Sequence, residues 1–340
     1  MTPVRVLVVD DSAFARKLLR ESLTTSRAIE VVGTARDGID ALEKIAELKP
    51  DVITLDLVMP NLDGLGLLAL LTPQQRARVV VVSMADGQSD IGVAALQMGV
   101  FGLVHKPTAL PVASLKDLAE ELVAQVLLAA TSRQPHDENA VAIPSALVAR
   151  VRSKRVVLIG TSTGGPQALT RLLKVLPADF PAPIAIVLHI PPGYTGPLAE
   201  RLNSDCAIAV AEAQDGLRLR PGLAILAQAG IHLRVAVGAE GLCVRLDKEP
   251  SGGLHRPAVD VLLESAASSV GKRALGVILT GMGDDGLNGA RAVTQAGGQV
   301  LTEAESSCVV YGMPRVVKEA GLSVAEVPLE RMAAEIVARL

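Results

Sequence analysis

The chain has 340 residues and a formal net charge of −3, with 33 basic and 36 acidic side chains. This length favours two domains, and the nearly balanced charge argues against a nucleic-acid-binding protein, which carries a basic surface. No apolar run is long enough to span a bilayer and no secretory signal opens the chain, so we expect a cytoplasmic protein without membrane insertion. The cysteines, Cys206, Cys243 and Cys308, are scattered without metal-ligand spacing and fit free thiols in a reducing compartment.

The first third of the chain alternates between predicted strands and helices. Short apolar runs predict strands at 4–9, 29–34, 51–55, 79–82 and 101–104, and helices are expected at about 12–23 and 38–48. This alternation is typical of a parallel sheet with helices on both faces. Ligands of such sheets bind beyond the carboxyl ends of the strands.

Polar side chains stand at these strand ends: Asp10, Asp11, Asp56, Ser83 and Lys106. Carboxylates brought together raise one another's pKa, and a divalent cation such as Mg²⁺, which prefers oxygen ligands, relieves this. The cation and Lys106 would hold a phosphoryl group during transfer to Asp56, which would become an acyl phosphate. Each acid alone is better explained as a solvated or helix-capping residue, but the set of five favours a phosphoryl site.

Residues 4 to about 125 resemble a response-regulator receiver domain. The matching segments are residues 8–12, residues 56–60 with Asp63-Gly64, Ser83-Met84 and Lys106-Pro107. The resemblance implies that Asp56 is phosphorylated by a histidine kinase, that Asp10, Asp11 and Asp56 hold Mg²⁺, and that Ser83 and Lys106 sense the phosphoryl group. Leu103 stands where many receivers carry a switch aromatic, and Val58 where they often carry a polar residue. Both departures concern switching and leave the phosphoryl chemistry as expected.

A helix is expected at 115–130, where apolar side chains recur at helical spacing. Residues 131–139 are polar, include Pro135 and lack an apolar period, which is typical of an exposed linker. We therefore divide the chain into a receiver domain at 1–125, a linker at 126–150 and a further domain at 151–340.

The glycine-rich segment 160–165 separates a predicted strand at 156–159 from a predicted helix at 167–176. Its glycines permit a sharp turn, and the helix start supplies unpaired N–H donors and the positive end of the helix dipole. Ser162 in this turn would attack a carbonyl beside donors that stabilise the developing charge. The same geometry suits a phosphate group. On this stretch alone, a capping serine or a phosphate site is favoured over a nucleophile.

The rest of the chain predicts a second parallel sheet. Strands are expected at 183–188, 207–212, 274–279 and 298–302, with two more, 222–227 and 232–237, around a turn. Helices are expected at about 195–202 and 260–270, after residue 286 through 293, and beyond residues 309–314.

Three chemically complementary residues, Ser162, His189 and Asp285, each follow a predicted strand of this sheet. Serine, histidine and aspartate form the acyl-transfer constellation, which is defined by roles and not by chain order. Ser162 would attack an ester, His189 would transfer the proton and Asp285 would fix the imidazole tautomer. Backbone N–H groups near Thr163 and Met282 would hold the oxyanion.

Two other histidines, His232 and His255, compete with His189 for the role of base. The hydrophobic pattern of the sequence favours His189 modestly, because His189 follows the most apolar strand. Asp284 and Asp285 lie in a glycine-rich turn, where aspartate is by default a turn former.

Residues 154 to about 325 resemble the catalytic domain of the chemotaxis protein-glutamate methylesterase family (CheB). The matching segments are 160–166, 189–193, 255–257, 280–286 and 308–314. The resemblance implies a serine hydrolase with Ser162, His189 and Asp285 as its triad and no cofactor in this domain. It also implies methyl-accepting chemoreceptors as substrate, a chemotaxis histidine kinase as phosphodonor, and deamidation of receptor glutamines.

The sequence thus predicts an α/β protein with two doubly wound parallel-sheet domains, a flavodoxin-like receiver and a Rossmann-like methylesterase domain joined by a linker. The predicted function is a phosphorylation-activated protein-glutamate methylesterase whose unphosphorylated receiver covers the sheet edge with Ser162. An alternative is a non-catalytic receiver-linked nucleotide-binding regulator, although His189 stands where such a protein needs an acidic ribose-binding residue. A DNA-binding regulator is disfavoured by the balanced charge.

Overall fold

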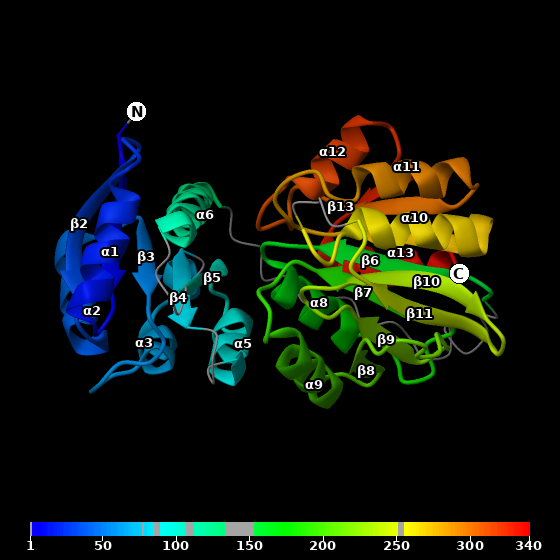
Figure 1. Cartoon of the computed structure of the whole chain (residues 1–340), viewed down its shortest axis with the longest axis horizontal. Helices are drawn as coiled ribbons and strands as arrows, with labels where there is room; N and C mark the ends of the chain where they lie inside the picture. The colour runs from blue at the N-terminus through cyan, green and yellow to red at the C-terminus, as the bar shows by residue number, and fades with distance from the viewer. Residues whose placement is uncertain (1, 77, 85–88, 107–111, 133–152, 251–254) are drawn as a thin grey trace. The chain divides into compact units, whose positions relative to one another are not determined.

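The computed structural model describes residues 2–340 apart from 77, 85–88, 107–111, 133–152 and 251–254. The chain divides into two compact units, Met1–Gln134 and Pro135–Leu340, each with its own parallel sheet (Figure 1). Among the described residues no helix is both long and apolar enough to cross a membrane, and Cys206, Cys243 and Cys308 are free thiols.

The sheet of the first unit has the strand order β2-β1-β3-β4-β5, with every neighbouring pair parallel. Its strands are β1 Val4–Val9, β2 Ile29–Ala35, β3 Val52–Leu55, β4 Val79–Met84 and β5 Gly102–Lys106. Its helices are α1 Ala13–Leu23, α2 Gly38–Leu48, α3 Gly64–Leu70, α4 Pro73–Arg76, α5 Ser89–Gln97 and α6 Val112–Thr131. This is the flavodoxin-like order, so the predicted fold of the first domain is confirmed.

Helix α6 passes through the predicted domain boundary at residue 125 and packs against α1 and the strands β3, β4 and β5. Val126 and Ala129, which fall in the predicted linker, are fully buried on it. These residues are therefore part of the first unit. Residues 133–150 of the predicted linker, with Pro135 and His136, lie outside the described residues, as does Pro107.

The sheet of the second unit has the strand order β14-β13-β12-β6-β7-β9-β8, again parallel throughout. Its strands are β6 Val156–Thr161, β7 Ile184–Leu188, β8 Ala209–Glu212, β9 Leu223–Leu226, β12 Ala274–Ile278, β13 Gln299–Glu303 and β14 Ala325–Val327. Its helices are α8 Gly165–Lys174, α9 Thr195–Asp205, α10 Val259–Val270, α11 Leu287–Gln295, α12 Met313–Glu319 and α13 Leu329–Ala338, with a 3₁₀ turn at Gly271–Arg273. The predicted doubly wound sheet is confirmed.

The strands predicted at 222–227 and 232–237 do not pair with each other. The first, β9, lies between β7 and β8 in the parallel sheet. The second, β10 (His232–Gly238), pairs antiparallel with β11 (Gly241–Asp247), which the sequence did not predict. Hairpin residues such as Leu233 and Val244 share one core cluster with α10 and one face of the sheet, so the hairpin extends the layer that covers that face.

The alternation of strand side chains explains this layering. Val156 and Leu158 of β6 belong to the core cluster shared with α10 and the hairpin, whereas Val157 and Ile159 do not belong to it. All four are fully buried. Because successive strand residues point to opposite faces, β6 is covered on both sides. It pairs with β7 on one edge and β12 on the other, which places the ends of these three strands together.

Candidate active site and acidic cluster

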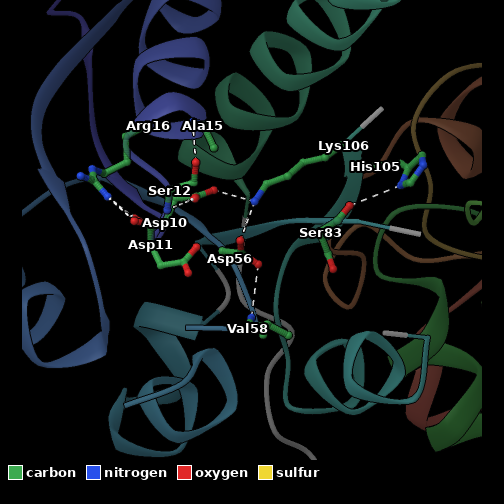
Figure 2. A network of polar contacts seen from close by, with 10 residues as sticks. All are labelled: Asp10, Asp11, Ser12, Ala15, Arg16, Asp56, Val58, Ser83, His105 and Lys106. Atoms are coloured by element: carbon green, nitrogen blue, oxygen red, sulfur yellow. Dashed lines mark hydrogen bonds and ion pairs between the residues drawn. The ribbon is translucent and has the colours of Figure 1, made fainter. Parts of the chain in front are cut away.

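The acidic cluster of the first unit forms where β1 and β3 end. Carboxylate oxygens of Asp10, Asp11 and Asp56 lie within 4.8 Å of one another. Figure 2 shows the three side chains gathered in one place. Asp10 is fully buried and Asp56 is 8% exposed, whereas Asp11 faces solvent. Three converging oxygen donors of which one is accessible suit a hard divalent cation that keeps water ligands.

Lys106 at the end of β5 bridges two of these acids. Its Nζ lies 2.5 Å from Asp10 Oδ2 and 2.6 Å from Asp56 Oδ2 (Figure 2). Burial acts to lower the pKa of Lys106, but the charges of Asp56 and Asp10 raise it above its ordinary value. Burial raises the pKa of Asp10, although Lys106 opposes this. One ammonium group thus bridges the carboxylates of Asp10 and Asp56.

Ser83, the last residue but one of β4, lies near this cluster and is fully buried (Figure 2). The carbonyl oxygen of Ser83 lies 3.3 Å from Nδ1 of His105, its partner on β5. Leu103, at the expected switch position, is 7% exposed, whereas Val58 is 47% exposed and its N–H lies 3.3 Å from Asp56 Oδ1. The structure thus brings all five sequence-predicted residues of this unit to one sheet edge.

The turn that carries Ser162 joins β6 to α8 in the second unit. Gly164, the N-cap of α8, has φ +78°, a backbone conformation that side chains disfavour. The N–H of Ser162 donates to the carbonyl of Thr280 at 3.0 Å, which ties the turn to the segment after β12. At Gly281 a Cβ atom would lie 2.9 Å from Ser162 Cβ, so close contact between the two segments requires a glycine.

His189 follows β7 and its backbone N–H donates to the carbonyl of Thr161 at 3.1 Å, beside Ser162. Its Nε2 lies 2.8 Å from Asp285 Oδ2. Nδ1 is buried and has no hydrogen-bond partner among the described residues, so it is not bonded to Ser162 Oγ. Because an ionised Asp285 accepts the Nε2–H, the lone pair of a neutral ring is on Nδ1.

The carboxylate of Asp285 is fixed by the start of α10. It accepts hydrogen bonds from the backbone N–H of Val259 at 2.7 Å and of Asp260 at 2.9 Å. Burial would raise the pKa of Asp285, but the hydrogen bond and charge of His189, with these two N–H groups, bring it below its ordinary value. Asp285 is therefore ionised at neutral pH and able to orient the imidazole.

The N–H groups of Thr163 and Met282 donate no hydrogen bond to any described residue. Both belong to the segments that meet at Ser162, and Met282 is 41% exposed. Free N–H groups at such a position are available to an oxyanion. Their oxyanion role stays a prediction, which these free N–H groups support.

His255, which the sequence offered as a rival base and as part of the matching segment 255–257, also lies in this site. Its ring stacks on that of His189, with centroids 4.0 Å apart and an interplanar angle of 15°. Burial and then the His189 charge lower the pKa of His255. His232 is elsewhere: it accepts the N–H of Ala258 on Nδ1 at 3.1 Å and contacts the Pro250 carbonyl through Nε2 at 3.2 Å. Both its ring nitrogens are engaged, which suits a structural role.

Comparison with known proteins gives two matching family models, CheB methylesterase over residues 157–336 and response regulator receiver domain over residues 6–115. Protein-glutamate methylesterase/protein-glutamine glutaminase 5 of Myxococcus xanthus is 58% identical over 338 residues, which cover 98% of this chain and 97% of that protein. A protein-glutamate methylesterase/protein-glutamine glutaminase of Koribacter versatilis is 42% identical over 332 residues, 94% of this chain and 92% of its own.

Among solved structures, the CheB methylesterase catalytic domain of Thermotoga maritima is 40% identical, with a TM-score of 0.54, and the match covers 55% of this chain and 100% of that one. These matches do not support the alternative of a non-catalytic nucleotide-binding regulator. The chain belongs to the CheB methylesterase family and combines its catalytic domain with a response-regulator receiver domain.

Proposed function

We propose that this chain is a phosphorylation-regulated protein-glutamate methylesterase that also deamidates glutamine, with methyl-accepting chemoreceptors as its substrate. The relatives named for both activities align over nearly the whole chain. The single observation that carries the chemical proposal is the 2.8 Å contact of His189 Nε2 with Asp285 Oδ2, one strand away from the turn with Ser162. It leaves the opposite ring nitrogen, Nδ1, without a hydrogen-bond partner among the described residues.

In the proposed reaction, Ser162 Oγ attacks the ester carbonyl carbon while His189 Nδ1 takes the hydroxyl proton. The negative charge that forms on the carbonyl oxygen is held by the N–H groups of Thr163 and Met282. Each such donor contributes about 3 to 4 kcal/mol to the transition state. His189 then returns its proton to the leaving methoxy group, and methanol departs from an acyl-enzyme on Ser162.

Water completes the cycle by the same route in reverse. His189 Nδ1 takes a proton from water as it attacks the acyl carbonyl, and the proton passes to Ser162 Oγ as the glutamate side chain is released. An amide substrate follows the same steps with ammonia as the leaving group. Throughout, Asp285 stays ionised and stabilises the imidazolium that forms on His189.

In the receiver domain we propose Asp56 as the residue that accepts a phosphoryl group from a histidine kinase. The fit of Mg²⁺ rests on the three convergent carboxylates of Asp10, Asp11 and Asp56. When bound, the ion supplies positive charge beside the phosphoryl oxygens. Lys106 would stay paired with the negative charge on Asp56, and the Ser83 hydroxyl would donate a hydrogen bond to the phosphoryl group. We propose that this phosphorylation relieves inhibition of the methylesterase domain.

The test of the function is release of methanol from methylated chemoreceptors. The wild-type chain should release methanol, and Ser162→Ala should lose this activity while it folds as the wild type does. Ser153→Ala, which changes a half-buried serine that precedes β6, is the matched control and should keep the wild-type rate. Equal rates in wild type and Ser162→Ala would overturn the proposal.

A further inference from the structure

Glu303, the last residue of β13, is a fully buried acid outside the triad. Its Oε2 accepts the backbone N–H of Thr280 at 2.8 Å, and its Oε1 accepts the hydroxyl of Ser307 at 2.9 Å. A carboxyl group buried this deeply costs free energy unless its oxygens are hydrogen-bonded. Both oxygens of Glu303 are hydrogen-bonded, so its position is defined. Glu303 holds Thr280 through the backbone N–H of Thr280.

Thr280 in turn holds the nucleophile turn. Its carbonyl oxygen accepts the N–H of Ser162 at 3.0 Å and the hydroxyl of Thr161 at 2.7 Å. Its own hydroxyl donates to the carbonyl of Thr163 at 2.9 Å. Three consecutive residues of the turn are thus bonded to one threonine. Met282, two residues further on, offers a proposed oxyanion donor from the same segment.

We propose that Glu303 is a positioning residue for Ser162, which it aligns through Thr280. This inference rests on the proposed function, since it concerns the geometry of the esterase site. The chain of contacts runs from β13 through the end of β12 to the end of β6. A shift of Thr280 would move both the Ser162 backbone and the segment with Met282. Misplacement of reacting groups by about 1 Å can reduce a rate on the order of 100-fold.

The charged and titratable groups that face Glu303 come from several elements. Arg171 of α8 favours the ionised form, whereas Glu330 of α13 opposes it. Burial dominates and raises the pKa of Glu303 to about 7, against the hydrogen bonds from Thr280 and Ser307. The Ser307 hydroxyl also lies 3.3 Å from the carbonyl of Ala304, to which it can donate when Oε1 is protonated. The bond from Thr280 to Oε2 therefore persists in both protonation states.

The experiment compares kcat and KM for methanol release in the full-length wild type, E303Q and E303L, each normalised to folded protein by circular dichroism. Gln keeps the length and an acceptor for Thr280, so kcat should stay within about threefold of wild type. Leu fills the space but leaves the buried N–H unpaired, so kcat should fall by about 10- to 100-fold with KM within about twofold. A wild-type kcat in E303L, or a loss in E303Q equal to that in E303L, would overturn the inference.

If E303L does not fold, E303D takes its place. Asp keeps the charge but is one methylene shorter, so it cannot reach Thr280 and Ser307 together. The inference requires a higher kcat for E303Q than for E303D, and the reverse order would contradict it. Wild type and Ser162→Ala are measured beside these variants. If those two do not differ, the proposed function fails; if they differ as expected, the Glu303 variants test the positioning role alone.

Discussion

The carboxylate of Asp285 accepts the backbone N–H of Asp260 at 2.9 Å, and the carboxylate of Asp260 accepts the N–H of Gly286, the residue after Asp285, also at 2.9 Å. Asp260 further accepts the N–H of Gly289 at 2.7 Å. The starts of α10 and α11 are therefore tied to each other by two acids. This reciprocal arrangement fixes the proposed catalytic acid on the backbone and leaves Oδ2 directed to His189.

Substitution should distinguish Asp285, the proposed catalytic acid, from its neighbour Asp284. Asp285→Asn should lower kcat by about 10³- to 10⁴-fold, because an amide can no longer stabilise the imidazolium or fix its tautomer. Asp284→Asn is the matched control, since Asp284 is exposed, and its kcat should stay within about twofold. Methanol release measures both. Equal effects of the two substitutions would contradict the assignment.

The stacked imidazoles should be linked in their titration. The positive charge of His189 contributes to the lowered pKa of His255. In His189→Gln this repulsion is absent, so the pKa of His255 should rise toward its ordinary value, although burial still lowers it. A titration of the His255 ring signals by NMR in the two proteins measures the change. An unchanged or lower pKa in the variant would contradict the contact.

Phosphorylation should depend on one aspartate. A small acyl phosphate supplied with Mg²⁺ should label the wild type and raise its rate of methanol release. Asp56→Asn should take up no label and show no response. Asp63→Asn, which changes the N-cap of α3, is the control and should behave as the wild type. The label is followed by intact mass, and a labelled Asp56→Asn protein would place the phosphoryl group elsewhere.

The buried acid at the end of β13 should make stability depend on pH. The pKa of Glu303 rises from 4.5 to about 7 in the folded chain, so its contribution to stability is complete below pH 4.5 and is lost as pH rises through 7. E303Q does not titrate. Relative to E303Q, wild type should therefore lose about 3 kcal/mol of unfolding free energy between pH 4.5 and pH 8. Denaturant unfolding of the second unit at both values measures this, and a constant difference would contradict it.

Much of the site could be predicted because its residues follow strongly apolar strands. Ser162 and His189 stand directly beyond β6 and β7, where the sheet itself determines their position. The contacts between side chains were harder to predict from the sequence. A histidine such as His255 carries no sequence signal for a ring stacked on another ring, and Glu303 belongs to no motif that the sequence pattern singled out.

The missed strands have physical reasons as well. β11 contains Arg245 and Asp247 and is half exposed, so its apolar period is weak. β14 has three residues, too few for any period. The sequence predicted β9 and β10 around a turn without assigning their partners, and β9 lies in the parallel sheet between β7 and β8.

The most direct measurement of the central claim is the kinetics of Ser162→Ala, His189→Gln and the double variant on one methylated chemoreceptor. When two residues act as one catalytic unit, the loss of either one removes the contribution of both. The double variant should therefore be no slower than the slower single variant. Losses that multiply in the double variant, or a His189→Gln enzyme with wild-type kcat, would show that the serine and the imidazole do not work together and would contradict the account.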